Sequence, residues 1–273
     1  MKKLNTTLVL QTISFGILFL SFLSGCEKEE EKIINDADGN IYKTIKIGQQ
    51  EWFAENLKTT KYSDGSSINN VTEPNDWSYL NEGAFSWFKN DFSEYGNLYG
   101  GMYNFYAIED PRGICPSGWR VPTVEDWQIL ISYLGDNPGG KLKESSTNYW
   151  SEPNTDATNE YGFTALPGGR RFSDGSFHNL NDGGYWYSSD AVTAYYIWHE
   201  KNTIDEFYPN KRVGLSIRCI SESSASLPSV YTSMPYPVAK DQGFVGGVIN
   251  ANGGAEITES GVFWGEEPNP INT

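Results

Sequence analysis

Cysteines carry the widest chemistry in this chain, and the sequence has three of them, at positions 26, 115 and 219. A thiol can be a nucleophile, a metal ligand or half of a disulfide, and its surroundings decide which. Cys26 follows an apolar segment near the start of the chain, whereas Cys115 and Cys219 form an even pair in the remainder. In an exported protein such a pair is most simply a disulfide, and closing a loop of about 100 residues stabilises the fold by roughly 4.7 kcal/mol in the chain-entropy model. The sequence therefore predicts a disulfide between Cys115 and Cys219.

Histidine is the next residue type that could do chemistry, and only His178 and His199 are present. A hydrolytic site needs a serine, a base and an orienting acid within hydrogen-bond reach of one another. The segments around the two histidines, SFHN and WHE, have no nucleophile-elbow pattern. We therefore expect ordinary hydrogen bonds at both histidines and no catalytic residue.

Oxygen-bearing side chains crowd one turn-rich segment, WSEPNTDATNE, and could bind a hard cation such as calcium. The candidate calcium ligands are Glu152, Asn154, Asp156, Asn159 and Glu160. The tripeptide EPN at 152–154 resembles the sugar-and-calcium tripeptide of C-type lectins, but it recurs at 73–75 and 267–269, and the usual WND partner is missing. Asx-turns explain such a loop without a metal, and that alternative stays open. No other cofactor is predicted.

Aromatic residues in and beside these turns are the candidate ligand-binding surface. The candidates are Tyr149, Trp150, Trp186, Tyr187 and Trp198. Flat aromatic faces can stack on sugar rings, and exposed apolar patches often mark binding sites. The alternative is that YWYSS and IWHE are strands whose aromatic residues fill the core.

The amino-terminal segment predicts export and a lipid anchor. Residues 1–25 begin with two lysines, continue with an apolar stretch that is too short and interrupted for a comfortable membrane span, and end in small residues, as a signal peptide does. LSGC at 23–26 resembles the bacterial lipobox, which implies that Cys26 is acylated and holds the chain at a membrane. The acidic tether 26–35 resembles the export signal of surface lipoproteins of the Bacteroidetes. We therefore expect an outer-membrane lipoprotein that is exposed at the cell surface.

The charge of the chain narrows the range of partners. Its formal net charge is −15, and removal of a signal peptide that contains Lys2 and Lys3 would leave −17. Nucleic acid and anionic lipid both favour a basic protein face, so this charge argues against them as partners. Neutral glycans, cations and surface proteins remain as candidate partners.

Hydrophobic patterning predicts short strands and one clear helix. Residues 41–47 alternate in the manner of a strand, and a turn at Gly48 leads to a second strand at 51–54. Thr123 can cap a helix that ends at Gly135, with Asp126 at the position where a capping box usually has Glu or Gln. The buried stripe of this helix is Trp127, Leu130, Ile131 and Leu134.

Several motifs occur in a characteristic order: GNIYKTIKIGQQEWFAENLKTTKYSDG, YGGMYNFYAI, CPSGWRVPTVEDW, GFTALPGGRRFSDGSF, YWYSSD and GLSIRCI. Together they resemble the Fibrobacter succinogenes major paralogous domain over residues 36–222. That family is in turn similar to the C-type-lectin-like fold of the formylglycine-generating, sulfatase-modifying enzymes. The resemblance implies an α+β, loop-rich domain with a small twisted antiparallel sheet and one or two short helices. Because those oxidases bind copper through a cysteine pair, it also leaves copper-binding thiolates as an alternative to the disulfide.

The end of the chain has a different composition. Residues 223–229 are rich in Ser and Pro and predict a linker. Residues 230–273 resemble the opening strands of an Ig-like or fibronectin-like repeat, a partial all-β segment that is shorter than the roughly 100 residues such a sandwich needs.

These features favour a surface-exposed, lipid-anchored module that binds or displays, with glycan or protein as its ligand, rather than an enzyme. A divergent enzyme related to the formylglycine-generating oxidases and a structural spacer without a ligand are the alternatives. A binding module predicts solvent-facing tryptophans, whereas an enzyme predicts a deep pocket with a strongly perturbed titratable group.

Overall fold

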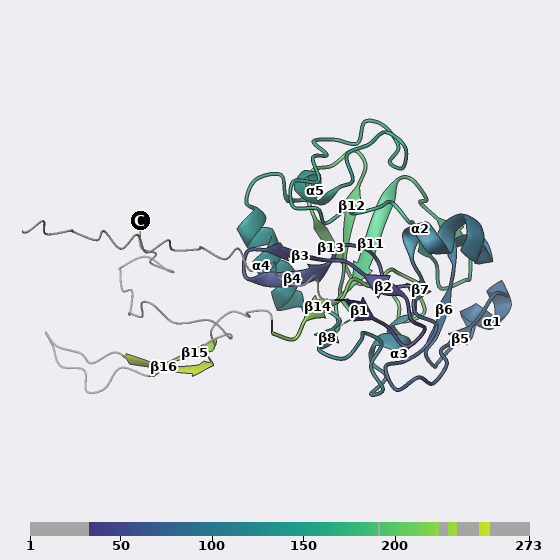
Figure 1. Ribbon diagram of the computed structural model, residues 1–273, viewed down its shortest axis with the longest axis horizontal. Coiled ribbons are helices and arrows are strands. Elements are labelled where there is room, and N and C mark those ends of the chain that lie inside the picture. The colour runs from purple at the N-terminus through teal and green to yellow at the C-terminus, as the bar shows by residue number, and fades with distance from the viewer. Residues whose placement is uncertain (1–32, 191, 224–228, 234–245, 252–273) are drawn as a thin grey trace, which may run out of the picture. The chain divides into compact units, whose positions relative to one another are not determined.

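The computed structural model describes residues 33–190, 192–223, 229–233 and 246–251. Residues 33–223 form a mixed α+β unit in which small sheets and short helices are joined by long loops (Figure 1). The predicted signal peptide 1–25, the lipidation site Cys26 and most of the tether 26–35 lie outside the described residues. In the part of the chain that the structure describes, no helix is both long and apolar enough to cross a membrane.

Three sheets and several strand pairs make up the β structure. The first sheet has the order β3 (Thr44–Ile47), β4 (Gln50–Phe53), β14 (Ile220–Ser221), β8 (Trp119–Arg120). The second has the order β11 (Gly183–Tyr187), β12 (Ala194–Trp198), β13 (Asp205–Phe207). The third has the order β5 (Asn69–Asn70), β6 (Ala84–Ser86), β7 (Met102–Tyr103). The remaining pairs are β1 (Ile34–Asn35) with β2 (Ile41–Tyr42), β9 (Arg170–Arg171) with β10 (Phe177–His178), and β15 (Ser229–Ser233) with β16 (Gly246–Ala251).

The helices are short, and the described residues contain more of them than the sequence predicted. They are α1 (Pro74–Ser78), α2 (Asn97–Tyr99), α3 (Phe105–Ile108), α4 (Val124–Leu134) and α5 (Pro138–Leu142), with a 3-10 turn at Phe88–Asn90 and a π turn at Phe92–Gly96. The α+β class is confirmed. The expectation of one small antiparallel sheet with one or two helices was wrong, because the described strands form several sheets and β5 pairs with β6 in parallel.

The first sheet joins the two ends of the domain. β14, from the end of the domain, pairs antiparallel with β4 from its beginning, where Ile220 lies opposite Trp52. On its other side β14 pairs antiparallel with β8, where Ile220 lies opposite Arg120. Residues more than 160 positions apart therefore share one sheet, and β14 has a partner on both edges.

Helix α4 forms as its sequence predicts. The Thr123 hydroxyl accepts from the Asp126 N–H at 3.1 Å, and the Asp126 carboxylate accepts from the Thr123 N–H at 2.7 Å, which completes a capping box. Asp126 also pairs with Arg120 of β8 and so joins the helix to the first sheet. The predicted stripe packs inward: Trp127 and Leu130 are fully buried, and Gly135 follows the last turn.

The strand predicted over 41–47 is interrupted, and at its beginning the tyrosine is buried while the isoleucine faces solvent. β2 stops at Tyr42 and β3 begins at Thr44, with Lys43 between them. Ile41 is 61% exposed while Tyr42 is buried and stacks on Phe53 at 4.6 Å. Tyr42 is buried because its hydroxyl can donate to the Asp36 carboxylate at 2.6 Å, which satisfies the polar group inside the fold.

Buried arginines hold loops to the body of the domain. Arg171 is fully buried and has no carboxylate partner; its guanidinium donates to the backbone carbonyls of Gly175, Val71 and Thr72. The same guanidinium lies 4.2 Å from the centre of the Trp77 ring. Burial lowers the pKa of Arg171 to about 10, but the carbonyl contacts satisfy its donors. Such contacts give the long loops a fixed backbone path.

The carboxyl-terminal segment is described only in part. β15 and β16 form an antiparallel pair in which Tyr231 lies opposite Val248. Residues 224–228 of the predicted linker 223–229 and most of the residues of 230–273 lie outside the described residues. The Ig-like or fibronectin-like assignment therefore stays a prediction.

Candidate functional site

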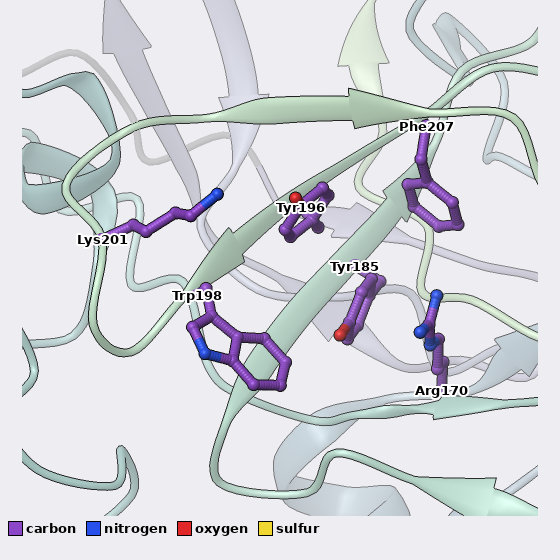
Figure 2. A pocket seen from close by; sticks show the side chains of 6 residues that line it. All are labelled: Arg170, Tyr185, Tyr196, Trp198, Lys201 and Phe207. Carbon is purple, nitrogen blue, oxygen red and sulfur yellow. The ribbon is translucent and has the colours of Figure 1, made fainter.

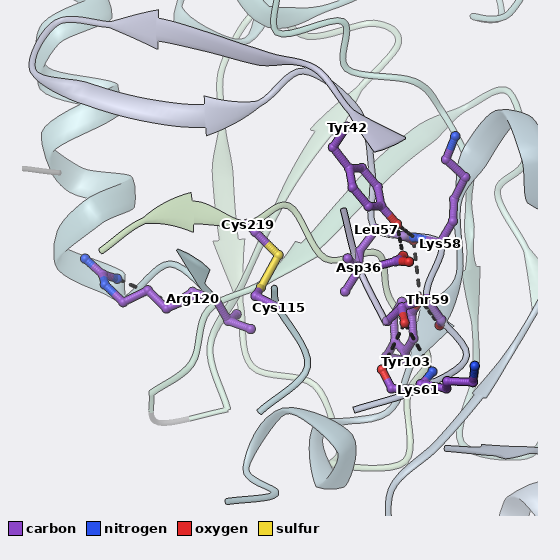
Figure 3. Close-up of a disulfide and its surroundings, with 11 residues drawn as sticks. Asp36, Tyr42, Leu57, Lys58, Thr59, Lys61, Tyr103, Cys115, Arg120 and Cys219 are labelled. Atoms are coloured by element: carbon purple, nitrogen blue, oxygen red, sulfur yellow. Dashed lines mark hydrogen bonds between the residues drawn. A yellow bond between two sulfur atoms is a disulfide. The ribbon is translucent and has the colours of Figure 1, made fainter. Parts of the chain in front are cut away.

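The predicted disulfide is present and accounts for both described cysteines. Cys115 and Cys219 are joined by a bond of 2.03 Å, with their Cα atoms 6.1 Å apart (Figure 3). Both residues are buried, Cys115 in the loop before β8 and Cys219 immediately before β14. Because each sulfur is bonded to the other, the pair offers no thiolate to a substrate or to copper in this structure. The sulfur chemistry at these positions is structural.

The histidines do not form a hydrolytic site. His178 Nε2 lies 2.9 Å from the Ser176 hydroxyl, but that hydroxyl also bonds the Asp174 carboxylate directly. In a triad the histidine stands between the serine and the acid, whereas here the serine does. His199 bonds the carbonyl oxygen of Glu152 through Nδ1 at 2.9 Å. Both histidines have ordinary structural contacts.

The acidic loop uses its side chains to fix its own path. Asn154 donates to the Glu144 carbonyl at 3.1 Å, and the Asn159 amide oxygen accepts from the Thr164 N–H at 2.7 Å. Asp156 accepts from the Asn202 amide at 2.6 Å. Within the described ranges no three His, Cys, Asp or Glu side chains gather in a manner suited to a metal ion. Glu152 and Glu160 are exposed, and together with Asp156 they do not form such a group.

Three of the five aromatic candidates are core residues, so their prediction as ligand platforms was wrong. Trp150 is 3% exposed, and Trp186 and Tyr187 are fully buried. Every residue of β11 is buried, because protein covers both faces of this strand. Tyr149 is half-buried and packs against the core cluster beside α4. Only Trp198 is both partly exposed and part of a pocket.

That pocket lies on the outer face of the second sheet and has a volume of about 390 Å³. Its lining residues are Arg170, Tyr185, Tyr196, Trp198, Lys201 and Phe207. Figure 2 shows their side chains gathered over the three strands, with Trp198 and Lys201 at one end and Arg170 and Phe207 at the other. We call this site the aromatic pocket.

The register of the sheet explains why these side chains meet. Tyr185 lies opposite Tyr196, and Gly183 lies opposite Trp198. Residues two apart on a strand share a face, so Tyr196 and Trp198 point the same way. Gly183 has no side chain, and the Tyr185 ring occupies the space there: a Cβ would approach that ring to 2.8 Å. The pairing therefore places the rings of Tyr185, Tyr196 and Trp198 together on one face of the sheet.

The rings of the pocket support one another. Tyr185 and Tyr196 are stacked, with centroids 5.7 Å apart and planes 21° apart. Phe207 meets both tyrosines edge-on, at 5.9 and 5.7 Å. These are the favourable geometries of aromatic pairs, so the walls are fixed before any ligand arrives.

Two cationic side chains complete the lining. The Arg170 guanidinium lies 4.7 Å from the Tyr185 ring centre and 5.5 Å from that of Phe207. Lys201 is exposed and pairs with Asp205 at 2.7 Å. Burial raises the pKa of Tyr185 to about 12, against the opposite effect of the Arg170 charge, so this phenol stays neutral at physiological pH. The pocket therefore offers flat apolar faces together with charged and neutral donors.

Sequence reasoning found Trp198 but missed the rest of this lining. The alternation of Tyr196 and Trp198 within AYYIW was a usable signal, because it places both on one face of a strand. Arg170 comes from β9, outside the second sheet, and nothing in the sequence pairs it with those strands.

A second hollow, of about 530 Å³, lies among polar loops. It includes Glu82, Asp110 and Arg112 in its lining. Arg112 bonds the Asp110 carboxylate through both Nε and Nη2, at 2.8 and 2.7 Å. These bonds hold the pKa of Asp110 at about 2, so Asp110 and Arg112 are paired with each other.

A buried lysine lies beneath the loop that carries Lys201. Lys143 is fully buried, and its ammonium donates to the carbonyls of His199 and Lys201 at 3.2 and 2.9 Å. Burial lowers its pKa to about 8 from the ordinary value of 10.5. Between these two pH values the unfolded chain binds more protons than the folded one, so the contribution of this group to stability rises with pH.

We expect Lys143→Met to remove this rise. From pH 7.5 to 10.5 the free energy of unfolding of the wild type should increase relative to that of Lys143→Met by at most about 3 kcal/mol. Urea unfolding of both proteins across this pH range measures the difference, and titrations common to both cancel. A difference that stays constant with pH would contradict the buried, easily deprotonated lysine.

The described residues define a disulfide-closed α+β domain with an aromatic pocket on one of its sheets. Residues 45–221 match the family model of the Fibrobacter succinogenes major domain, and the chain belongs to this family. The comparison with curated proteins and the comparison with solved structures found no match to this chain.

Proposed function

We propose that this domain is a saccharide-binding module and that the aromatic pocket is its binding site. The observation that supports this best is Trp198, which is partly exposed on a wall of fixed rings. Within the described residues its indole N–H has no hydrogen-bond partner. The buried Trp127 indole also lacks one, but Trp198 is partly exposed and lines a pocket, so a ligand can reach it. An aromatic face with a free donor at its edge suits a ligand that is apolar on one side and rich in hydroxyls at its rim.

The size of the pocket favours a small ligand. Its volume of about 390 Å³ lies within the range of about 300 to 1,000 Å³ that is typical of small-molecule sites. A stable protein partner would cover about 800 Å² on each side, which is a broad surface rather than a hollow. One or two sugar rings are an appropriate occupant for such a space.

The chemistry of the lining favours a sugar over other small ligands. Sugar rings present C–H faces that stack on Trp198 or Tyr196, and their hydroxyls can bond to Lys201 and to the free indole N–H. Binding without catalysis is proposed because the pocket residues include no acid–base pair positioned for bond cleavage.

We expect Trp198→Ala to weaken saccharide binding by roughly tenfold to a hundredfold, because a stacked aromatic anchor dominates the energy of a small site. A glycan array probed with the full chain, in calcium and in chelator, measures the effect. The chelator should leave binding unchanged, because the lining of the pocket includes no acidic side chain.

Tyr79→Ala is the matched control, because Tyr79 is 83% exposed and does not line the aromatic pocket. It should bind as the wild type does. An array without any saccharide signal would overturn this proposal and would favour a protein ligand or a spacer role. Binding that survives in Trp198→Ala would place the site elsewhere.

The finer fold and the cellular location are also proposals. We propose a C-type-lectin-like arrangement, supported by the pairing of β4, near the beginning of the domain, with β14 at its end and by the disulfide that closes it. We propose a lipid anchor at Cys26 that holds the module at the cell surface, supported by LSGC and the acidic residues after it. Fatty-acid labelling that is lost in Cys26→Ala would support the anchor.

A further inference from the structure

One arginine in this chain differs from the others in the hydrogen bonds and ion pairs of its side chain. The sequence has six arginines, and all six lie in the described ranges. Arg112 and Arg120 pair with carboxylates, and Arg171, Arg212 and Arg218 donate to backbone carbonyls. Of the six, only the Arg170 side chain makes no hydrogen bond and no ion pair within the described residues, although it is only partly exposed.

The surroundings of Arg170 are rings rather than acceptors. Its guanidinium carbon lies 4.6 Å from the Phe172 ring centre, 4.7 Å from that of Tyr185 and 5.5 Å from that of Phe207. The Nε atom is buried and has no partner. Ring faces stabilise the cation, but they accept no hydrogen bond in the plane of the guanidinium. A partly buried charged donor without an acceptor is costly, and it requires an explanation.

The contrast with Arg171 on the same strand makes the explanation specific. Arg171 and Arg170 are neighbours on β9, and they point to different surroundings. Arg171 finds three carbonyl acceptors inside the protein. Arg170 instead lines the aromatic pocket, so the acceptor that it lacks can come from a ligand there.

We propose that the ligand of the aromatic pocket is an acidic sugar whose carboxylate is bound by Arg170. This inference rests on the saccharide-binding function proposed above and names the class of sugar. The planar guanidinium fork matches a carboxylate with two parallel N–H···O bonds, which are stronger than bonds between neutral groups. No acidic side chain lines the pocket beside Arg170, so a carboxylate on the ligand meets no like charge there.

The two ends of the pocket then have different tasks. Trp198 and Lys201 lie at one end, while Arg170 and Phe207 lie at the other (Figure 2). A sugar ring stacks on the aromatic wall, and its carboxylate reaches Arg170. Lys201 already has Asp205 as a partner, so its charge is largely neutralised and it contributes less to the choice of an anion.

The test compares the affinity of the protein for acidic sugars with its affinity for the corresponding neutral sugars. The full chain is applied to a glycan array that carries uronates, sialosides and sulfated sugars beside the neutral sugars from which they derive. Calorimetric titration with trigalacturonate and with its fully methyl-esterified form then isolates the carboxylate. We expect carboxylate sugars to bind roughly tenfold to a hundredfold more tightly than their neutral counterparts, and the preference to decrease with salt.

Variants assign this preference to one side chain. Arg170→Gln should bring the ratio of acid to neutral affinity down to about one, and Arg170→Lys should restore only part of the preference because it lacks the fork. Lys46→Gln is the matched control, because Lys46 is an exposed cation on the first sheet and should change neither affinity. The comparison of acid with ester in the wild type remains valid even if Arg170→Gln fails to fold.

The outcomes separate this inference from the proposed function. Saccharide binding that depends on Trp198 but is equal for acid and ester would overturn the inference and leave the proposed function intact. A preference for sulfated sugars over uronates and sialosides would overturn the assignment of a carboxylate. The absence of any saccharide binding would overturn both.

Discussion

Replacing Cys115 and Cys219 together with alanine is expected to lower the free energy of unfolding by about 4 kcal/mol. The bond joins residues 104 positions apart, and so it removes much of the freedom of the unfolded chain. It also lies at a structural junction, because Cys115 is in the loop before β8 and Cys219 precedes β14, which pairs with both β8 and β4. Urea unfolding of the variant and the wild type measures the loss.

A reductant provides the control. It should lower the stability of the wild type to that of the double variant and leave the double variant unchanged. Alanine at both positions avoids a free thiol, which a single replacement would leave to react with other molecules. A loss below about 1 kcal/mol would contradict the role of this bond as the main covalent constraint of the domain.

Arg218→Met is expected to lower the free energy of unfolding by about 3 kcal/mol. Arg218 is 1% exposed, and it donates to the Asn56 amide oxygen from Nε and Nη2, at 3.1 and 2.7 Å. Its Nη1 donates to the Phe163 carbonyl, and its guanidinium lies 4.2 Å from the centre of the Phe163 ring. One side chain thus joins the segment before β14 to two loops that are distant in sequence.

Two effects oppose each other in Arg218→Met, and their sizes decide whether the replacement raises or lowers the free energy of unfolding. Burial lowers the pKa of Arg218 to about 9, so the charge itself is destabilised inside the protein and its removal relieves that cost. Methionine, however, leaves the Phe163 carbonyl without a partner and part of the guanidinium volume empty, and each of these costs about 1 to 3 kcal/mol. Asn56 keeps one donor, the Trp186 indole at 2.8 Å. The net effect should be destabilising.

Arg112→Met is the matched control for this prediction. Arg112 is an arginine of the same chain whose side chain is 41% exposed and pairs with Asp110 at the surface. Exposed pairs contribute at most about 1 kcal/mol, so this variant should unfold close to the wild type. Equal stabilities of Arg218→Met and Arg112→Met would show that the buried hydrogen bonds do not hold the loops.

The sequence predicted correctly those elements that a short stretch of residues determines. The helix that begins after Thr123 and ends before Gly135 was predicted because its cap, stripe and stop all lie within 13 residues. The strands around Tyr185 and Tyr196 were one of two interpretations of the segments YWYSS and IWHE, and the structure contains both strands. The Cys115–Cys219 disulfide followed from the number of cysteines and the expectation of export rather than from any knowledge of the fold.

The lining of the aromatic pocket depends on tertiary packing, which no local sequence pattern contains. Trp186 and Trp198 look alike in the sequence, yet one is in the core and the other lines the pocket, because protein covers both faces of β11 but not both faces of β12. The acidic loop looked like a cation site because the sequence shows which oxygens are present and not which N–H groups they bond. Arg170 joins the pocket only through tertiary packing.

Hydrogen exchange by mass spectrometry tests the central claim most directly, namely that the aromatic pocket is where this protein binds its ligand. The full chain is measured alone and with a saturating amount of the saccharide that binds most tightly on the array. The account predicts slower exchange in residues 183–207, and no such change for Trp198→Ala under the same conditions. Slower exchange confined to the loops around Glu82 and Arg112, with residues 183–207 unchanged, would contradict it.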